Sequence, residues 1–215
     1  MFLFFDTETT GLPRNWNAPV TELENWPRLV QLAWLLYDRD GNRLDGCEHI
    51  IKPEGFSVPE ESARVHGITT EKAMMDGENL QKVLEEFSEK MGKSEILVAH
   101  NMSFDEKIIG AEFLRNNIKN DLFDKERICT MLSSIEFCQI PSQNGKGYKW
   151  PRLSELHIKL FGEDFADAHD ALVDTDACAR CFFELCKREI IEVPEMEISE
   201  MKKNDSKVSK QGSLF

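Results

Sequence analysis

Two carboxylates, Asp6 and Glu8, follow directly on the apolar residues that open the sequence, MFLFFDTETTGL. Residues two apart on a β-strand face the same way, so both acids can converge on one point. Like charges repel, and an apolar setting disfavours the ionised form of each, so a buried pair needs a stabilising partner. Exposed acids at a strand end need none, and the pair by itself leaves both interpretations open.

A third acid, Asp105, stands in the first turn of a predicted helix, SFDEKIIGAEFLRNN, for which Ser103 is the expected N-cap. Asp105 precedes Ile108 and Ile109 by three and four residues, so it leans toward the buried face of that helix. An acid in a first helical turn can also merely offset the helix dipole.

The fourth acid is Asp174, which shares one face of the last predicted helix with apolar residues at i+4, i+7 and i+11. Asp176 aligns instead with Arg180, a surface partner. Asp174 is therefore the acid expected to point inward without a cation on its own helix. His169 lies just upstream, in the loop that enters the helix, with Asp170 as the expected N-cap.

Four carboxylates brought to one place cannot all stay ionised without cations. Oxygen ligands without cysteine or paired histidine favour hard ions such as Mg²⁺ or Mn²⁺. Pairs of such ions stabilise the attacking and leaving oxygens at phosphorus. Histidine ordinarily titrates near neutrality, so His169 can deprotonate an attacking water. The pattern predicts metal-assisted hydrolysis of a phosphate ester.

Strands and helices must position these residues. Buried strands are predicted at FLFFD, LVQLAWLLYD, RLDGCEHIIKP and EILVAHN, the first three as a meander. Helices are predicted at VPEESARVHGIT, ENLQKVLEEFSEKMG, SFDEKIIGAEFLRNN, RLSELHIKLFG and DALVDTDACARCFFELCKRE. Strands first, then alternating strands and helices, indicate an α/β or α+β domain with a mixed sheet.

The length and composition favour one domain with a tail. Residues 1–191 hold enough of the 41% hydrophobic content for a sizeable core, whereas 192–215 are polar and default to disorder. The net charge of −13 argues against holding long nucleic acid by electrostatics alone. We expect no signal peptide or membrane span and a cytoplasmic protein.

The six cysteines are expected to be reduced thiols. Cys178, Cys181 and Cys186 could suggest a zinc cluster, but no partner CxxC or histidine pair accompanies them. Buried packing on the last helix is the favoured interpretation.

The segments FFDTETTGL, HNMSFD and HDALVD resemble, in order and spacing, the three motifs of the DEDDh (DnaQ-like) 3′–5′ exonucleases, which include the proofreading epsilon subunit of bacterial DNA polymerase III. The resemblance covers roughly residues 1–190. It implies a ribonuclease H-like fold, a mixed five-stranded sheet flanked by helices. The insertion at 13–27 is longer than in the shortest members, and its role is open.

The resemblance also implies functions for individual residues. Two Mg²⁺ (or Mn²⁺) ions would be held by Asp6, Glu8, Asp105 and Asp174, with His169 as general base. Four residues after D-x-E would contact the terminal nucleotide: Thr9, Thr10, Gly11 and Leu12. Leu12 would wedge against the last bases, although core packing is the alternative. His66 is a further binding candidate, while Asn101 and Phe104 are expected to support the second motif rather than touch substrate.

The sequence ends in QGSLF, which resembles the pentapeptide by which bacterial proteins dock on the sliding clamp. Its anchors would be Gln211, Leu214 and Phe215, on a polar tether. Gly212 departs from the usual leucine and should weaken binding. An incidental apolar pair at a frayed terminus is the alternative.

These observations favour a two-metal 3′–5′ exonuclease that releases nucleoside monophosphates from single-stranded or frayed DNA 3′ ends, in proofreading or repair. Its expected partners are the clamp and a DNA polymerase catalytic subunit. One alternative is an exoribonuclease that trims RNA 3′ ends, since nothing here decides the sugar. Another is a non-catalytic subunit bound to the clamp or polymerase, against which the intact acid set argues.

Overall fold

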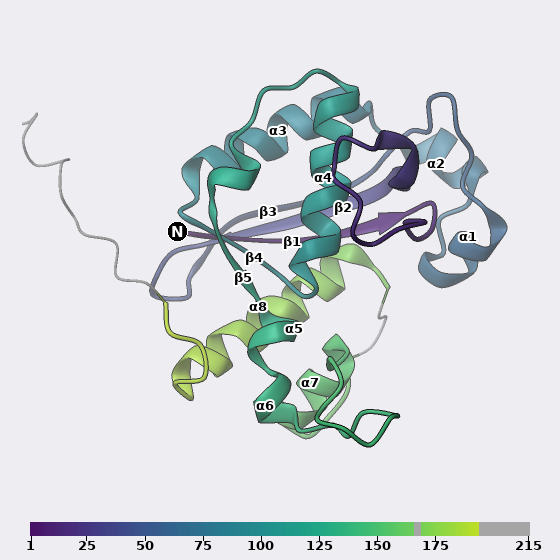
Figure 1. The fold of residues 1–215 in the computed structure, drawn as a ribbon. Coiled ribbons are helices and arrows are strands. Elements are labelled where there is room, and N and C mark those ends of the chain that lie inside the picture. Colours follow the sequence, from purple (N-terminus) through teal and green to yellow (C-terminus); the bar gives the residue numbers. More distant parts are fainter. Residues whose placement is uncertain (166–168, 194–215) are drawn as a thin grey trace, which may run out of the picture.

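The computed structural model describes residues 1–165 and 169–193 of the chain. Five strands form one sheet in the order β3-β2-β1-β4-β5 (Figure 1). They are β1 (Phe2–Thr9), β2 (Leu29–Tyr37), β3 (Arg43–Ile50), β4 (Ile96–Ala99) and β5 (Glu126–Cys129). The pairs β1–β2 and β2–β3 are antiparallel, and β1–β4 and β4–β5 are parallel. The prediction of a mixed five-stranded sheet flanked by helices is confirmed.

The helices are α1 (Glu60–His66), α2 (Thr70–Asp76), α3 (Leu80–Lys93), α4 (Met102–Arg115), α5 (Thr130–Ser133), α6 (Ile135–Cys138), α7 (Leu153–Phe161) and α8 (Ala171–Lys187). The five predicted helices occur in the predicted order, and the described residues form three short helices, α2, α5 and α6, that were not predicted. Two short 3-10 turns are η1 (Leu23–Asn25) and η2 (Leu122–Asp124). The stretch around 121–148, for which the sequence predicts no clear elements, supplies the fifth strand and two short helices.

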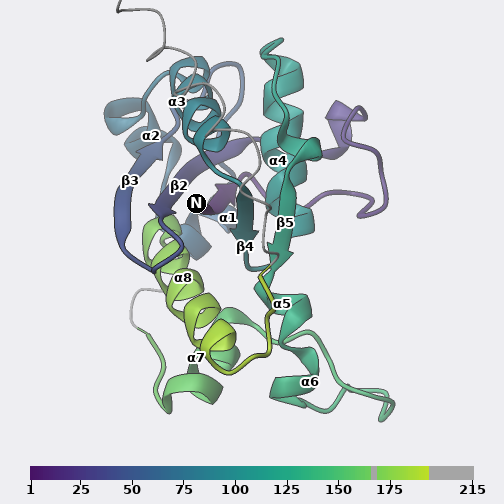
Figure 2. The ribbon, with the colours of Figure 1, turned by 90° about the vertical axis from the view of Figure 1, so that its left-hand side faces the viewer.

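The sheet separates two hydrophobic cores. Leu3 and Phe5 of β1 pack into the core with α3 and α4, whereas Phe2 and Phe4 pack into the core with α7 and α8. Figures 1 and 2 show the two helix layers on opposite faces of the sheet. Because strand side chains alternate, Asp6 and Glu8 continue the row of Phe2 and Phe4 on the α8 face.

Two helix starts were predicted from capping residues, and one of the two predictions is confirmed. Asp170 is the N-cap of α8, and its carboxylate accepts hydrogen bonds from the backbone N–H groups of Leu172 and Val173 at 3.0 and 3.2 Å. Ser103 as N-cap of α4 is wrong: the helix begins at Met102, after Asn101 in the left-handed conformation with φ of 74°. Asparagine tolerates this conformation better than most residues, so the chain can turn from β4 into the helix earlier.

The cysteines and the ends of the described chain complete the fold. All six cysteines are free, and Cys178 and Cys181 are buried in the core that α8 shares with the sheet, as helix packing predicts. No helix in the described ranges is long and apolar enough to span a bilayer. The predicted tail beyond 193, with Gln211, Leu214 and Phe215, lies outside the described residues.

Candidate active site

The four predicted acids come together where three elements meet. Asp6 and Glu8 lie on β1, while Asp105 and Asp174 lie in the first turns of α4 and α8. Burial comes first among the causes that raise the pKa of Asp6 well above its ordinary value, followed by the charges of Asp105, Asp174 and Glu8. Carboxylates that affect one another in this way share a single site.

The electrostatics of this cluster are unfavourable without a cation. Burial, with the charge of Asp174 next, raises the pKa of Glu8 to about 8. Burial likewise raises the pKa of Asp105 to about 7, against the opposing effect of its hydrogen bonds with Thr7. Burial also raises the pKa of Asp174. Near neutral pH the cluster therefore binds protons that an ordinary set of surface acids would have released.

Asp105 is held against β1 by two hydrogen bonds. The backbone N–H and the Oγ1 hydroxyl of Thr7 both donate to its Oδ1 atom, at 3.1 and 2.7 Å. Thr7 lies between Asp6 and Glu8 on the strand but faces the α4 side. Thr7 thus fixes the acid from α4 beside the two acids of β1.

Asp174 and His169 are joined through the loop that enters α8. The backbone N–H of His169 donates to Oδ2 of Asp174 at 3.1 Å, and His169 adopts a φ of 74°. One ligand atom each from Glu8, His169 and Asp174 lies within 4.8 Å of the others. The Oε1 atom of Gln31 on β2 accepts a hydrogen bond from the N–H of Ala171 at 3.3 Å, which ties the start of α8 to the sheet.

This donor set fits divalent metal ions. The four side chains offer carboxylate oxygens, the ligands that Mg²⁺ and Mn²⁺ prefer. Their raised pKa values are the expected result of grouping buried carboxylates without a counter-charge. Cations bound here would remove that penalty.

A cavity of about 510 Å³ opens beside Glu8. Its walls come from the end of β1, the following turn, α1 and the start of α4. The lining residues are Thr7, Glu8, Thr9, Gly11, Leu12, Glu61, Ser62, Val65, His66 and Phe104. Among the described residues no lysine or arginine lines it, so a bound phosphate would rely on metal ions for neutralisation.

The predicted substrate residues fall into two groups. Thr9, Gly11, Leu12 and His66 line the cavity, but Thr10 does not. The N–H and Oγ1 of Thr10 are both engaged with the backbone of Arg28, as donor and acceptor respectively, each at 2.9 Å. Thr10 therefore belongs to the packing of the turn that follows β1.

Leu12 projects into solvent at the cavity rim. It is 72% exposed, which rules out the alternative that it packs in the core. The hydroxyl of Thr9 donates to the carbonyl of Gly11 at 2.7 Å, and Gly11 has a φ of 146°. This short turn displays Leu12 beside the acids.

His66 lies at the inner side of the cavity. Its Nδ1 accepts a hydrogen bond from the N–H of Ile68 at 3.2 Å, and its Nε2 is buried without a hydrogen-bond partner in the described chain. Burial lowers the pKa of His66. A backbone hydrogen bond opposes this effect, and the charge of His169 adds to it. A neutral His66 close to His169 is consistent with a polar contact to a bound ligand.

An aromatic pair, Phe104 and Trp16, lies at this cavity through Phe104, and neither residue was predicted to contact substrate. Phe104, expected only to support its motif, lines the cavity and lies against Trp16, with ring centroids 5.6 Å apart. Trp16 belongs to the 13–27 insertion and is 48% exposed. A tryptophan in a polar insertion is unusual and could have pointed to a function for Trp16. Its contact with Phe104, 88 positions later in the chain, could not be predicted from the spacing of residues.

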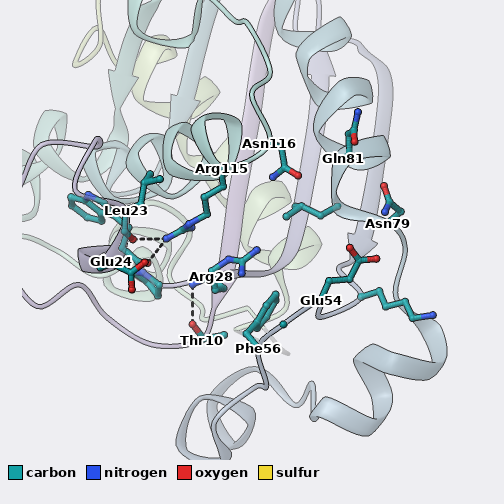
Figure 3. A pocket seen from close by; sticks show the side chains of 15 residues that line it. Thr10, Leu23, Glu24, Arg28, Glu54, Phe56, Asn79, Gln81, Arg115 and Asn116 are labelled. Atoms are coloured by element: carbon teal, nitrogen blue, oxygen red, sulfur yellow. Dashed lines mark hydrogen bonds between the residues drawn. The ribbon is translucent and has the colours of Figure 1, made fainter.

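A larger cavity, of about 670 Å³, is lined by Thr10 and none of the four acids. Figure 3 shows Arg28 against the ring of Phe56, with Arg115 nearby; the guanidinium carbon of Arg28 lies 4.3 Å from the ring centroid. Both arginines also pair with the buried Glu112, at 2.8 and 2.9 Å. Two further carboxylates line the cavity: Glu24 and Glu54. Its positive charge is thus offset, which makes it a poor phosphate site.

Comparisons with known proteins identify similar sequences and similar folds. A family model described as "Exonuclease" (RNase_T) matches residues 3–182. The PolC-type DNA polymerase III of Staphylococcus aureus is 26% identical in an alignment of 194 positions, which covers 87% of this chain and 11% of the polymerase.

The similar solved structures include E. coli exonuclease I in complex with a dA16 oligonucleotide, with a TM-score of 0.67 and 21% identity over 87% of this chain and 41% of that one. Exonuclease I from Methylocaldum szegediense has a TM-score of 0.66 and 20% identity, with coverage of 87% and 40%. The chain thus spans about a tenth of the polymerase and two fifths of these exonucleases, with which it shares the fold.

Proposed function

Because this chain belongs to the exonuclease family that the RNase_T model describes, we propose that it is a metal-dependent 3′–5′ exonuclease that releases nucleoside monophosphates from DNA 3′ ends. The observation that carries the proposal is the convergence of Asp6, Glu8, Asp105 and Asp174 on one place. Glu8 lines a cavity there, and a ring nitrogen of His169 lies close to Glu8 and Asp174. The direction of digestion rests on the resemblance of the three motifs.

The four carboxylates would hold two Mg²⁺ (or Mn²⁺) ions. When bound, such ions stabilise the negative charge that develops on the attacking and leaving oxygens of a phosphodiester. The side chains prepare this site by their placement. Thr7 anchors Asp105, and the N–H of His169 anchors Asp174, so neither acid needs to be reoriented when substrate arrives.

His169 is the proposed general base. A ring nitrogen of His169 lies within 4.8 Å of carboxylate oxygens of Glu8 and Asp174, two of the proposed metal ligands, which supports this role. Its side chain is exposed, so the proton that it takes from a water can pass to solvent after each turnover.

The cavity is suited to one terminal nucleotide. Its volume of about 510 Å³ lies within the range of small-molecule sites. Phe104 offers an aromatic ring on which a base can stack, a contact worth about 1–3 kcal/mol, and Leu12 adds apolar surface beside it. The absence of cations from the lining in the described chain leaves the phosphate to the metal ions, in keeping with a net charge of −13.

DNA is the proposed substrate, and proofreading or repair the proposed role. Two relatives support this: one similar structure was solved with a DNA oligonucleotide, and one similar sequence is a DNA polymerase. A polymerase catalytic subunit and a sliding clamp, bound through Gln211, Leu214 and Phe215, are the proposed partners. RNA trimming remains the second candidate because the cavity offers no feature specific to either sugar.

The test is nucleotide release from matched single-stranded DNA and RNA, labelled at the 3′ end. We expect stepwise release of mononucleotides from DNA in Mg²⁺, a stop on adding EDTA, and no release by Asp6→Ala. Faster release from RNA would transfer the assignment to the second candidate. Equal release by the wild type and Asp6→Ala would contradict the catalytic site itself.

A further inference from the structure

A second group of metal-ligand side chains lies on the other face of the sheet. Cys47 and His49 are two residues apart on β3, an edge strand, and therefore point to the same face. Glu86 on α3 lies opposite them. The potential ligand atoms of these three residues lie within 4.8 Å of one another. This group is separate from the acids of the candidate active site, which face α8.

His49 is held in a defined orientation. Its ring stacks on Trp34 with centroids 5.0 Å apart, and only 7% of His49 is exposed. Its Nδ1 lies 2.6 Å from Oε1 of Glu78, the residue just before the N-cap of α3. A carboxylate at Nδ1 fixes the tautomer with the proton on Nδ1, which leaves the lone pair of Nε2 available.

The Nε2 atom of His49 is the feature that calls for a ligand. It is buried and has no hydrogen-bond partner in the described chain. The nearest carboxylate oxygen, Oε2 of Glu86, is 3.7 Å away, too far for a hydrogen bond. A buried nitrogen left in this state costs free energy unless something else binds it. A metal ion between Nε2, Glu86 and Cys47 would satisfy it.

We propose that Cys47, His49 and Glu86 form a Zn²⁺ site, with Glu78 as the carboxylate that orients His49. Thiolate, imidazole and carboxylate together favour zinc over Mg²⁺, which prefers oxygen alone. Ligands of one tetrahedral zinc lie about 3.3–3.8 Å apart, given bond lengths of about 2.0–2.3 Å. Glu86 is partly exposed, so its side chain can rotate to close the remaining distance.

Binding of Zn²⁺ at this site requires only the loss of one proton and no oxidant or reductant. The Cys47 thiol loses its proton to solvent as the sulfur bonds to zinc, and water fills the fourth position at the partly exposed rim. The ion would join edge strand β3 to α3, so its role would be structural. An alternative is a protonated His49 that pairs with Glu78 and Glu86 and binds no metal.

Cobalt titration distinguishes these possibilities. Co²⁺ serves as a spectroscopic stand-in for Zn²⁺, because a cobalt–thiolate bond produces charge-transfer absorption that carboxylate sites cannot. Excess Mg²⁺ keeps the active-site acids occupied. We expect the wild type to show this absorption with one equivalent of Co²⁺ and to lose it when Zn²⁺ is added. Cys47→Ser should abolish it, and the matched control Cys186→Ser, in the other core, should keep it.

Chelator competition with Zn²⁺ provides the second measurement. We expect Cys47→Ser and Glu86→Gln to weaken binding at least tenfold, and Glu78→Gln to weaken it about tenfold through His49. Nuclease activity in Mg²⁺ should be unchanged in Cys47→Ser. Circular dichroism without metal checks the fold, and Glu86→Gln decides the matter if Cys47→Ser fails to fold. Absence of thiolate absorption in the wild type, or equal zinc affinity in wild type and both direct-ligand variants, would overturn the proposal.

Discussion

Carboxylates that are close in the sequence can lie in different surroundings in this protein. Asp174 and Asp176 are two residues apart on α8, yet only Asp174 joins the acid cluster. Asp176 lines a small separate cavity with Arg43 and Arg180. Burial of Tyr37, a residue packed against the α7–α8 core, raises the pKa of its hydroxyl, and the negative charge of Asp176 raises it further. This pair offers a matched comparison.

We predict that Asp174→Asn lowers nuclease activity about 100-fold or more, because the proposed metal ligand is lost where charge develops in the transition state. Asp176→Asn should stay within a few-fold of the wild type. Single-turnover release of a labelled 3′ nucleotide measures both. Similar losses in the two variants would mean that the helix face does not determine function.

His169→Ala should remove most of the turnover while it leaves metal binding intact, because His169 is proposed to move a proton rather than to hold an ion. In the wild type, turnover should rise with pH over the range in which histidine loses its proton. A kcat–pH profile, paired with calorimetric titration of Mn²⁺, measures both properties. A variant with the normal profile and normal turnover would exclude the role.

The raised carboxyl pKa values predict how the metal-free protein responds to pH. The pKa of Glu8 rises from 4.5 to about 8 on folding, chiefly through burial, so the folded state binds more protons than the unfolded state between these values. Stability without metal should therefore fall as pH rises from about 4.5 to 8. Glu8→Gln should raise the Tm at pH 8 by about 5 °C, since it relieves on the order of 2 kcal/mol after allowance for solvent.

Thermal melts in EDTA at pH 5 and pH 8 measure this effect, and Mg²⁺ should raise the Tm of the wild type at pH 8 more than at pH 5. An unchanged Tm between the two pH values in EDTA would contradict the proposed repulsion. The same measurement on Asp176→Asn serves as the control, since that acid lies outside the cluster.

At the scale of elements, the site depends on how α4 and α8 are fixed to the sheet. Glu112, which is fully buried, accepts hydrogen bonds from Arg28 and from the N–H of Leu29 and pairs with Arg115. Arg115 in turn donates to the carbonyl of Leu23 in the 13–27 insertion, at 2.6 Å. Glu112 thus joins α4, the start of β2 and the insertion that carries Trp16.

Removal of this central charge should destabilise the whole domain. Glu112→Gln leaves two arginines short of their partner, and breaking such a buried pair costs about 3 kcal/mol, or about 6–12 °C in Tm. Glu60→Gln, in an exposed pair with Arg64, should change the Tm by less than about 2 °C. Differential scanning calorimetry compares the two. A small effect of Glu112→Gln would show that the network is dispensable.

At the scale of the whole molecule, we expect net charge and the proposed tether to determine which ends the enzyme reaches. The chain has a net charge of −13, and no cation lines the cavity beside Glu8 in the described residues. Electrostatic attraction to long DNA is therefore weak, and a tether to a DNA-bound partner would raise the local concentration of 3′ ends. The QGSLF terminus is the proposed tether.

We predict micromolar binding of the full-length chain to the sliding clamp of its own source, abolished by Leu214→Ala/Phe215→Ala. Each anchor would bury apolar surface worth about 1.5–3 kcal/mol. Activity on free oligonucleotides should be unaffected, because the three motifs lie upstream. Calorimetry that finds equal affinity for both proteins, or no binding by either, would remove the clamp from the proposed function.

The sequence by itself determined what depends on local periodicity. The alternation of β1 places Asp6 and Glu8 on one face, and the 3.6-residue repeat of α8 separates Asp174 from Asp176, so both relations could be read directly. The mixed sheet followed from the order of the elements. The start of α4 could not be predicted from the sequence. Ser103 was the expected N-cap, but Asn101 adopts the left-handed conformation, and the helix begins directly after it.

Only the tertiary structure decided which distant residues meet. Trp16 packs on Phe104, Thr10 turns away from the cavity that Thr9 lines, and Glu86 comes to lie beside His49. None of these arrangements follows from the spacing of residues in the sequence. Each depends on how a turn or a helix packs against a part of the chain that is far away in sequence. Local periodicity determines the face on which a side chain lies, but the packing of whole elements determines what that face meets.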